Sequence, residues 1–187
     1  MKVLVACEFS GIVRDAFARK GHDAWSCDLL PSEREGNHIQ GDVLKIFEDG
    51  WDLMIAHPPC TFLCNSGVYL LHERDGRWQQ MIESANFFRS LVNAPIERIA
   101  VENPIPHKYA LEIIGRKYDE IIQPWWFGVG DTKAICLWLK NLPPLMATVV
   151  HTGRYGRSHM ESPSPERWKN RSRTYQGIAE AMPEQWG

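Results

Sequence analysis

The chain has 187 residues, of which 44% are hydrophobic and 24% charged, and this balance excludes a chain that is disordered by composition. Its net charge of −2 gives none of the basic footprint that a duplex-binding domain shows. No apolar run reaches membrane-spanning length, no secretory signal opens the sequence, and the five cysteines show no framework spacing. We therefore expect a cytoplasmic protein with reduced thiols, no membrane contact and a single catalytic domain over residues 1–187.

The first half of the chain alternates short apolar runs with one helical segment. Residues 2–7 are β-branched and apolar, which predicts a buried strand, and residues 12–20 are predicted to form a helix that Gly21 ends. Further strands are predicted over residues 22–27, at 38–40 and over 51–56.

The second half carries the clearest helix signal, between residues 76 and 93. There apolar side chains recur at three- and four-residue steps and form one stripe: Trp78, Met81, Ile82, Ala85, Phe88, Leu91 and Val92. Strands are predicted over 96–101, 118–123 and 134–139, the last two as a closing hairpin-like pair, and a last helix over 177–186. Between them, residues 147–173 form an Arg-punctuated loop rich in Ser, Pro and Gly.

Strands that alternate with helical segments predict βαβ units and a mostly parallel, Rossmann-like α/β sheet with helices on both faces. Ligands of such sheets bind beyond the carboxyl ends of the strands. The residues with chemical capability each follow a predicted strand directly: Glu8, Asp28, Asp42, Cys60 and Glu102. The sequence therefore predicts that they meet at one edge of the sheet.

The sequence after the first strand, CEFSG, lacks the glycine-rich dinucleotide fingerprint. Gly11 still allows the backbone to approach a ligand, without a cradle for a pyrophosphate. Asp28 lies where an acid would hold ribose hydroxyls, and Asp42 could accept from an adenine amino group. Each acid could equally cap a helix or face water. Acids at three successive strand ends favour a nucleoside-containing cofactor that has no pyrophosphate.

Cys60 follows two prolines that fix the backbone at a strand exit. A cysteine thiolate is a strong nucleophile once its pKa falls, whereas a buried structural cysteine is the alternative. We assign that structural role to Cys7, Cys27 and Cys136, which lie in predicted apolar strands. Glu102 ends the neighbouring strand and could protonate a ring nitrogen beside the thiol, or serve as a capping or salt-bridged residue.

At these residues the chain resembles the cytosine-C5 DNA methyltransferase family, in a minimal form without a target-recognition domain. EFSGIVRDAF resembles the family's first motif, Pro59-Cys60 its catalytic pair, and Glu102-Asn103 its Glu-Asn motif. The likeness runs in order over roughly residues 1–140, with the final helix added. It implies an S-adenosylmethionine-dependent methyltransferase sheet, and it gives the cofactor contacts to Glu8, Phe9, Ser10, Gly11, Asp28, Leu29, Asp42, Val43 and Pro58.

The resemblance implies methyl transfer to C5 of cytosine, most simply in DNA. The Cys60 thiolate would add to C6 while Glu102 protonates or hydrogen-bonds N3, and loss of the C5 proton would release the thiol. Pro59 completes the catalytic set, and a base in a duplex would first be flipped out. Contacts to the substrate would come from His57, Asn103, Lys133, Arg171 and Arg173.

Three features depart from the family's pattern. Its Arg-x-Arg strand is not visible, so Lys133 is the nearest cation, and Thr61 follows Cys60 in place of the common Gln. There is also no room for a target-recognition domain, and the loop over 147–173 takes its place. Its six cations could neutralise phosphates of DNA, or the segment could be a solvated loop. A partner protein could instead supply recognition, and the oligomeric state stays open.

Three other functions remain open. A zinc deaminase is suggested by His57, Cys60 and Cys64, but H-x-E and P-C-x-x-C are absent, so we expect no metal. A free pyrimidine nucleotide such as dCMP or dUMP could be the substrate of C5 modification by methyl or another group. The chain could also be a catalytically inactive Rossmann-like binding module with Cys60 as a relic. Its small size suits a phage-like enzyme.

Overall fold

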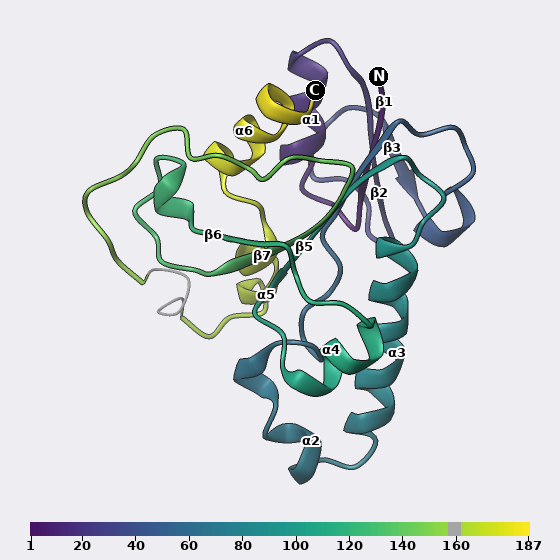
Figure 1. The fold of residues 1–187 in the computed structure, drawn as a ribbon, viewed down its shortest axis with the longest axis vertical. Helices are drawn as coiled ribbons and strands as arrows, with labels where there is room; N and C mark the ends of the chain where they lie inside the picture. The colour runs from purple at the N-terminus through teal and green to yellow at the C-terminus, as the bar shows by residue number, and fades with distance from the viewer. Residues whose placement is uncertain (157–161) are drawn as a thin grey trace.

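The computed structural model describes residues 1–156 and 162–187, so Arg157 of the Arg-punctuated loop lies outside the described residues. Seven strands form one sheet in the order β3-β2-β1-β4-β5-β7-β6 (Figure 1). Strands β1 to β5 pair in parallel, whereas β7 is antiparallel to both of its neighbours. The strands are β1 (Lys2–Ala6), β2 (Asp23–Asp28), β3 (His38–Gln40), β4 (Leu53–Ala56), β5 (Arg98–Pro104), β6 (Glu120–Ile122) and β7 (Ile135–Lys140).

Helices cover both faces of this sheet, and the strands alternate their side chains between the two faces. Val3 and Val5 of β1 pack in one core cluster with the helices α1 and α6, while Leu4 and Ala6 pack in the other with α3 and α4. The predicted Rossmann-like α/β fold is therefore confirmed. The helices are α1 (Ile12–Arg19), α2 (Leu70–Glu73), α3 (Arg77–Val92), α4 (Lys108–Ile114), α5 (Arg167–Ser172) and α6 (Gln176–Trp186), with 3-10 turns η1 (Val43–Lys45), η2 (Asn65–Gly67) and η3 (Pro124–Trp126).

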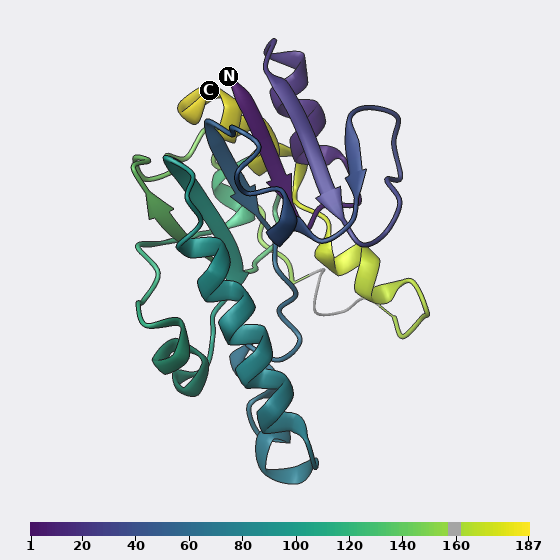
Figure 2. The same ribbon diagram turned by 90° about the vertical axis from the view of Figure 1, so that its right-hand side faces the viewer.

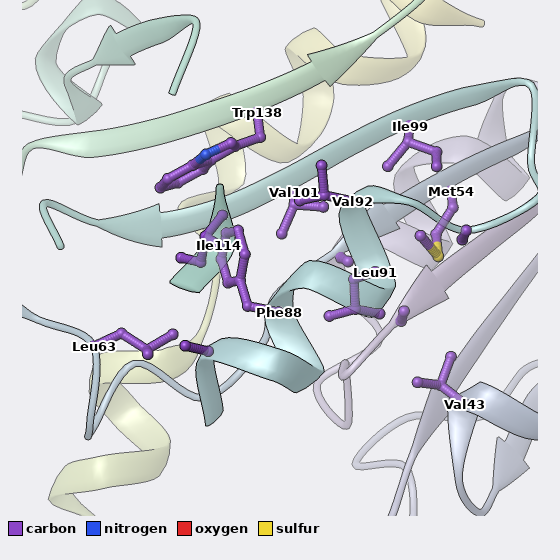
Figure 3. Packing of buried hydrophobic residues seen from close by; sticks show 14 of the residues in the cluster. Val43, Met54, Leu63, Phe88, Leu91, Val92, Ile99, Val101, Ile114 and Trp138 are labelled. Atoms are coloured by element: carbon purple, nitrogen blue, oxygen red, sulfur yellow. The ribbon is translucent and has the colours of Figure 1, made fainter. Parts of the chain in front are cut away.

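The core beneath α3 is built around aromatic packing. Phe88 meets Trp138 of β7 edge-to-face, with ring centroids 4.7 Å apart, and Ile114 of α4 lies beside them (Figure 3). Five members of the predicted stripe are buried, but Trp78 and Ile82 are 38% and 37% exposed. They lie toward the N-terminal end of α3, and this end extends beyond the sheet (Figure 2).

Two boundaries differ from the sequence prediction around the chemically interesting residues. Glu102 and Asn103 lie within β5, opposite Leu137 and Cys136 of β7, and do not follow the strand. The Glu-Asn-Pro sequence resembles a turn, but the antiparallel partner β7 supplies hydrogen bonds that continue the strand. Cys7 in turn lies after β1, with a φ of 57° in the left-handed region, and not within the strand.

The described part of the predicted loop over 147–173 contains a helix that the sequence did not predict, α5. No helix among the described residues is both long and apolar enough to cross a membrane.

In the sheet, β1 lies between β2 and β4, so the order of the strands reverses there. A topological switch point of this kind is where open α/β sheets bind their ligands, beyond the carboxyl ends of the strands.

Candidate active site

Cys60 starts a tight turn just after β4. Its carbonyl oxygen accepts hydrogen bonds from the backbone N–H groups of Leu63 and Cys64, both at 3.0 Å. Pro58 is buried and Pro59 exposed, and their rings fix the backbone that leads from His57 to the thiol. The half-buried Cys60 side chain is therefore held at the carboxyl edge of the sheet, as the sequence predicted.

Cys64 lies one turn further along and changes the chemistry of Cys60. A hydrogen bond from the Cys64 thiol, helped by the charge of Lys133, lowers the pKa of Cys60 to about 7 against the opposing effects of burial and of Glu102. The same hydrogen bond raises the pKa of Cys64, which therefore stays protonated. Sequence reasoning missed this partnership, although the four-residue spacing from Cys60 is the signal that could have found it.

Glu102 faces this turn from the adjacent strand β5. Its Oε2 lies 3.2 Å from Nδ1 of His57, the residue that directly follows β4. Burial acts to raise the pKa of Glu102, but the hydrogen bond from His57 and the charges of Lys133 and His57 outweigh it and hold that pKa below its usual range. The structure thus brings together the predicted catalytic residues with the predicted substrate contacts His57 and Lys133.

Two buried polar atoms beside this pair have no hydrogen-bond partner among the described residues, namely Nε2 of His57 and Oδ1 of Asn103. Asn103 donates its Nδ2 to the carbonyl oxygen of Pro58 at 3.1 Å, which ties β5 to the nucleophile turn. Buried polar atoms are nearly always hydrogen-bonded in folded proteins. These two atoms are therefore candidates for contacts with a ligand.

Lys133 links the site to the C-terminal part of the chain. Its Nζ donates to the carbonyl oxygen of Arg171 at 3.1 Å and lies 5.8 Å from the centroid of the Tyr175 ring. The Tyr175 hydroxyl donates to Asp131 at 2.6 Å. A small pocket is lined by Glu102, Lys133 and Tyr175, so the predicted cation and the predicted catalytic carboxylate border one cavity.

The predicted cofactor edge begins after β1 with a network that supports α1. The buried carboxylate of Glu8 accepts from the backbone N–H groups of Val13 and Arg14, at 2.7 and 3.2 Å, and from the hydroxyl of Ser10 at 3.2 Å. Glu8 therefore caps the positive end of the helix. Gly11 precedes α1 with a φ of 69°, a conformation that favours glycine.

The other predicted cofactor residues differ in their burial and in their hydrogen-bond partners. Asp28 ends β2 and accepts from Leu30 N at 2.9 Å, and burial raises its pKa. Asp42 is exposed and caps η1. Burial raises the pKa of the Cys7 thiol, and the charges of Asp28 and Asp42 add to this rise. The Leu29 side chain is 74% exposed beside them, whereas the Val43 side chain is buried in the core (Figure 3).

This edge fits a nucleoside-containing cofactor. Asp28 and Asp42, which both act on the Cys7 thiol, could hold ribose hydroxyls and an amino group, and the exposed Leu29 offers an apolar contact. Phe9 lies against Trp168 of α5, with ring centroids 6.0 Å apart, so the C-terminal segment covers the loop after β1.

Arg14 organises the same edge, and sequence reasoning did not single it out. Its guanidinium is buried and donates to the hydroxyls of Ser26 and Ser32, at 3.3 and 3.2 Å, and to the carbonyl oxygen of Glu35 at 2.7 Å. It thereby ties α1 to the loop that follows β2. The available signal was an arginine among the buried apolar residues of a helix, where an unpaired charge would be costly.

The cations of the Arg-punctuated segment mostly contact groups of the same chain. Arg173 makes a two-pronged contact with Glu33, with Nε–Oε2 and Nη2–Oε1 distances of 3.0 and 2.7 Å. Arg154 lies 4.0 Å from the centroid of the Trp125 ring. Arg171 is exposed and meets the site through its backbone carbonyl.

No cluster of three or more His, Cys, Asp or Glu side chains that could hold a metal ion occurs within residues 1–156 and 162–187.

No protein-family model matches this chain, and no curated protein does either. Among solved structures, the chain is similar to a DNA modification methyltransferase encoded within a prophage (E. coli), with 16% identity and a TM-score of 0.49 over 86% of this chain. It is also similar to the Entamoeba histolytica methyltransferase EhMeth, with 16% identity and a TM-score of 0.48 over 88% of this chain. The chain spans 55% and 61% of those two proteins, less than two thirds of either.

Proposed function

We propose that this chain transfers a methyl group from S-adenosylmethionine to C5 of cytosine, with Cys60 as nucleophile and DNA as the substrate. The observation that carries the proposal is that Cys60, in the turn after β4, and Glu102, within the adjacent strand β5, are close enough for the charge of Glu102 to act on the thiol. The thiol has a lowered pKa, and the half-buried carboxylate contacts His57. The resemblance of the surrounding motifs to the cytosine-C5 family supports the same reaction.

The reaction begins at the thiolate of Cys60, which forms a bond to C6 of the base. In this step Glu102 carries a proton while the base is bound, and it hydrogen-bonds or protonates N3 and so draws electron density from the ring. The hydrogen bond from His57 and the charge of Lys133, which lower the pKa of Glu102 in the absence of a base, act against this protonation. C5 bonds to the methyl carbon as the bond of that carbon to the sulfonium sulfur breaks, which leaves S-adenosylhomocysteine. Loss of the C5 proton to water then breaks the bond between the Cys60 sulfur and C6 and restores the thiolate. S-adenosylmethionine, when bound by Phe9, Asp28 and Asp42, supplies the electrophilic methyl group.

Three other residues position these groups. Cys64 keeps the thiolate available by donating to it, and Asn103 fixes the turn through the carbonyl oxygen of Pro58. His57 holds Glu102 through Nδ1, which leaves its buried Nε2 for a polar atom of the substrate. Lys133 takes the role of the family's missing Arg-x-Arg cation beside the pocket.

The test is transfer of labelled methyl from S-adenosylmethionine to duplex DNA, single-stranded DNA and dCMP, measured in parallel. Cys60→Ala should abolish transfer, whereas Cys136→Ala, which alters a buried cysteine of β7, should retain it if the protein stays folded. A 5-fluorocytosine substrate should trap a covalent adduct by mass spectrometry, because loss of a C5 proton is blocked. Transfer that survives in Cys60→Ala would overturn the proposal.

A free pyrimidine nucleotide is the second candidate substrate. It is favoured by the internal partners of the cations at the C-terminal end, such as the Glu33 contact of Arg173, and by the net charge of −2. Label in dCMP alone would support this substrate. No label in any acceptor, with cofactor binding retained, would favour the inactive binding module or dependence on a recognition partner.

A further inference from the structure

A second feature of the molecule lies beyond the carboxyl edge of the sheet. Here α2, the start of α3 and α4 form a projection, which we call the distal lobe and define as residues 65–80 and 105–114. Figure 2 shows α2 and the first turns of α3 extending past the strand ends. The lobe leaves much aromatic surface exposed, including Tyr69 at 56% and Trp78 at 38%. Such surface on a small protein often marks a binding site.

An open groove of about 400 Å³ crosses the lobe. Its walls carry aromatic rings and hydrogen-bonding groups, supplied by Asn65, Tyr69, His72, Lys108 and Tyr109. Behind the rings, Trp78 meets Tyr109 and His72 edge-to-face, at centroid distances of 4.9 and 5.5 Å. These contacts fix the orientation of the His72 and Tyr109 rings, and flat rings held in place suit the binding of a flat ligand.

The groove is rigidly connected to the nucleophile turn. Asn65 donates its N–H to the carbonyl oxygen of Ile105 at 2.9 Å, and the His107 N–H donates to that of Leu63 at 3.0 Å. Arg77 donates to the carbonyl oxygen of Thr61, the residue after Cys60, at 2.9 Å. Asn65, which lines the groove, directly follows Cys64, so the groove adjoins the turn that carries Cys60.

The charges of the lobe nearly balance. Lys108 lies 4.9 Å from the centroid of the Tyr109 ring and supplies one cation in the groove. On the adjoining turn Glu73 and Asp75 offset Arg74 and Arg77. A duplex, which is held mainly through its phosphates, would need a more basic surface, whereas unpaired bases can stack on the exposed rings while Lys108 supplies a cation for the backbone.

We propose that this groove binds the unpaired nucleotides next to the target base by stacking them on Tyr69, Tyr109 and His72, with Lys108 near the backbone. Bases expose their flat faces only when they are unpaired, so the groove fits a single strand and not a duplex. It would supply contacts to the substrate beside the target base. The inference rests on the proposed function for the identity of the substrate as nucleic acid.

The experiment measures the affinity of a fluorescently labelled single-stranded oligodeoxynucleotide by anisotropy, with duplex of the same sequence as competitor. Loss of one stacking ring in Tyr69→Ala should weaken binding by about 5- to 100-fold, as expected for one stacked base. Lys108→Ala should weaken it less. The matched control is Lys117→Ala, because Lys117 is exposed and also lies over the following ring, 5.1 Å from the centroid of Tyr118, but outside the groove.

Unchanged affinity in Tyr69→Ala, equal losses in Lys108→Ala and Lys117→Ala, or tighter binding of the duplex would each overturn the inference. Thermal unfolding of each variant separates a lost contact from a lost fold, which is not expected for an exposed side chain. Failure of this inference can be distinguished from failure of the proposed function. Methyl transfer to dCMP that depends on Cys60 tests the chemistry alone, because a single nucleotide has no neighbouring bases to occupy the groove. Capture of a peptide but no oligonucleotide would also overturn it.

Discussion

The candidate active site and the Arg-punctuated segment both contain polar residues that the sequence singles out, the first as residues after predicted strands and the second as a run of cations. In the structure, the polar groups of these two regions differ in their partners. At the catalytic edge, Glu102 and His57 contact each other, yet buried atoms of His57 and Asn103 lack partners among the described residues. In the segment over 147–173, the cation of Arg173 is paired with Glu33 and that of Arg154 rests on Trp125.

A run of charged residues is therefore a weaker indication of a ligand-binding site than a single buried polar atom without a partner. A surface cation is solvated whether or not it meets a ligand, and an ion pair at the surface contributes little. A buried polar atom has lost its water, so leaving it unpaired is costly. We therefore look for substrate contacts at His57 and Asn103 before Arg171 and Arg173, whose predicted contact with DNA stays a prediction.

The largest effect should come from Glu102→Gln at the catalytic edge. The amide retains the shape of the side chain but cannot deliver a proton, so methyl transfer should fall by about 10²- to 10⁴-fold. Cofactor affinity, measured by calorimetry, should stay the same. The control is Glu120→Gln, since Glu120 of β6 is also half-buried but accepts only from a backbone N–H, that of Leu145, among the described residues. A rate within a few-fold of the unmodified protein would remove Glu102 from the mechanism.

Gly177→Ala tests how firmly the C-terminal end is attached. An added Cβ would lie 1.8 Å from the carbonyl oxygen of Phe127, so the start of α6 must move away from that residue. The free energy of unfolding should fall by about 1–3 kcal/mol, although alanine is the better helix former. Chemical denaturation measures this, with Gly41→Ala as control because nothing lies within 4 Å of its added Cβ. A higher free energy of unfolding in Gly177→Ala would show that the start of α6 packs only loosely against Phe127.

Cys64→Ala removes the donor that lowers the pKa of Cys60. In the unmodified protein the alkylation rate of Cys60 by iodoacetamide should rise with pH through a midpoint near 7, because the thiolate is the reactive form. In the variant the midpoint should move toward about 8.5, the value of an ordinary thiol, which lowers the rate at pH 7 about tenfold. Site-resolved mass spectrometry follows the reaction. An unmoved midpoint would assign the activation to Lys133 alone.

The smallest effect concerns Arg173 and Glu33. A double-mutant cycle of Arg173→Ala and Glu33→Ala should give a coupling energy of about 0.2–1 kcal/mol in unfolding experiments. The hydrogen bond and charge of Arg173 lower the pKa of Glu33, so this contribution is present above the ordinary range of a glutamate and is lost as pH falls through the lowered pKa. DNA affinity that drops in Arg173→Ala and rises in Glu33→Ala would instead identify Arg173 as a phosphate contact.

The sequence by itself determined the order of the elements and the edge at which the chemistry gathers. The apolar runs and the stripe of α3 are local periodic patterns, and they predicted every strand within a few residues as well as α1, α3 and α6. Because parallel strands present their carboxyl ends together, the placement of Cys60 and Asp28 followed from the same patterns. The continuation of β5 through Glu102 did not, since the hydrogen bonds that extend it come from β7, distant in sequence.

Only the tertiary structure decided which polar groups face one another. The Arg14 guanidinium ties together segments that lie up to 21 residues apart, and Arg173 reaches Glu33 across 140 residues. The aromatic groove likewise joins Tyr69 to Tyr109 through the packing of α2 and α3 against α4. A sequence pattern records which face of an element is apolar, whereas the partner of a polar side chain depends on how distant elements pack.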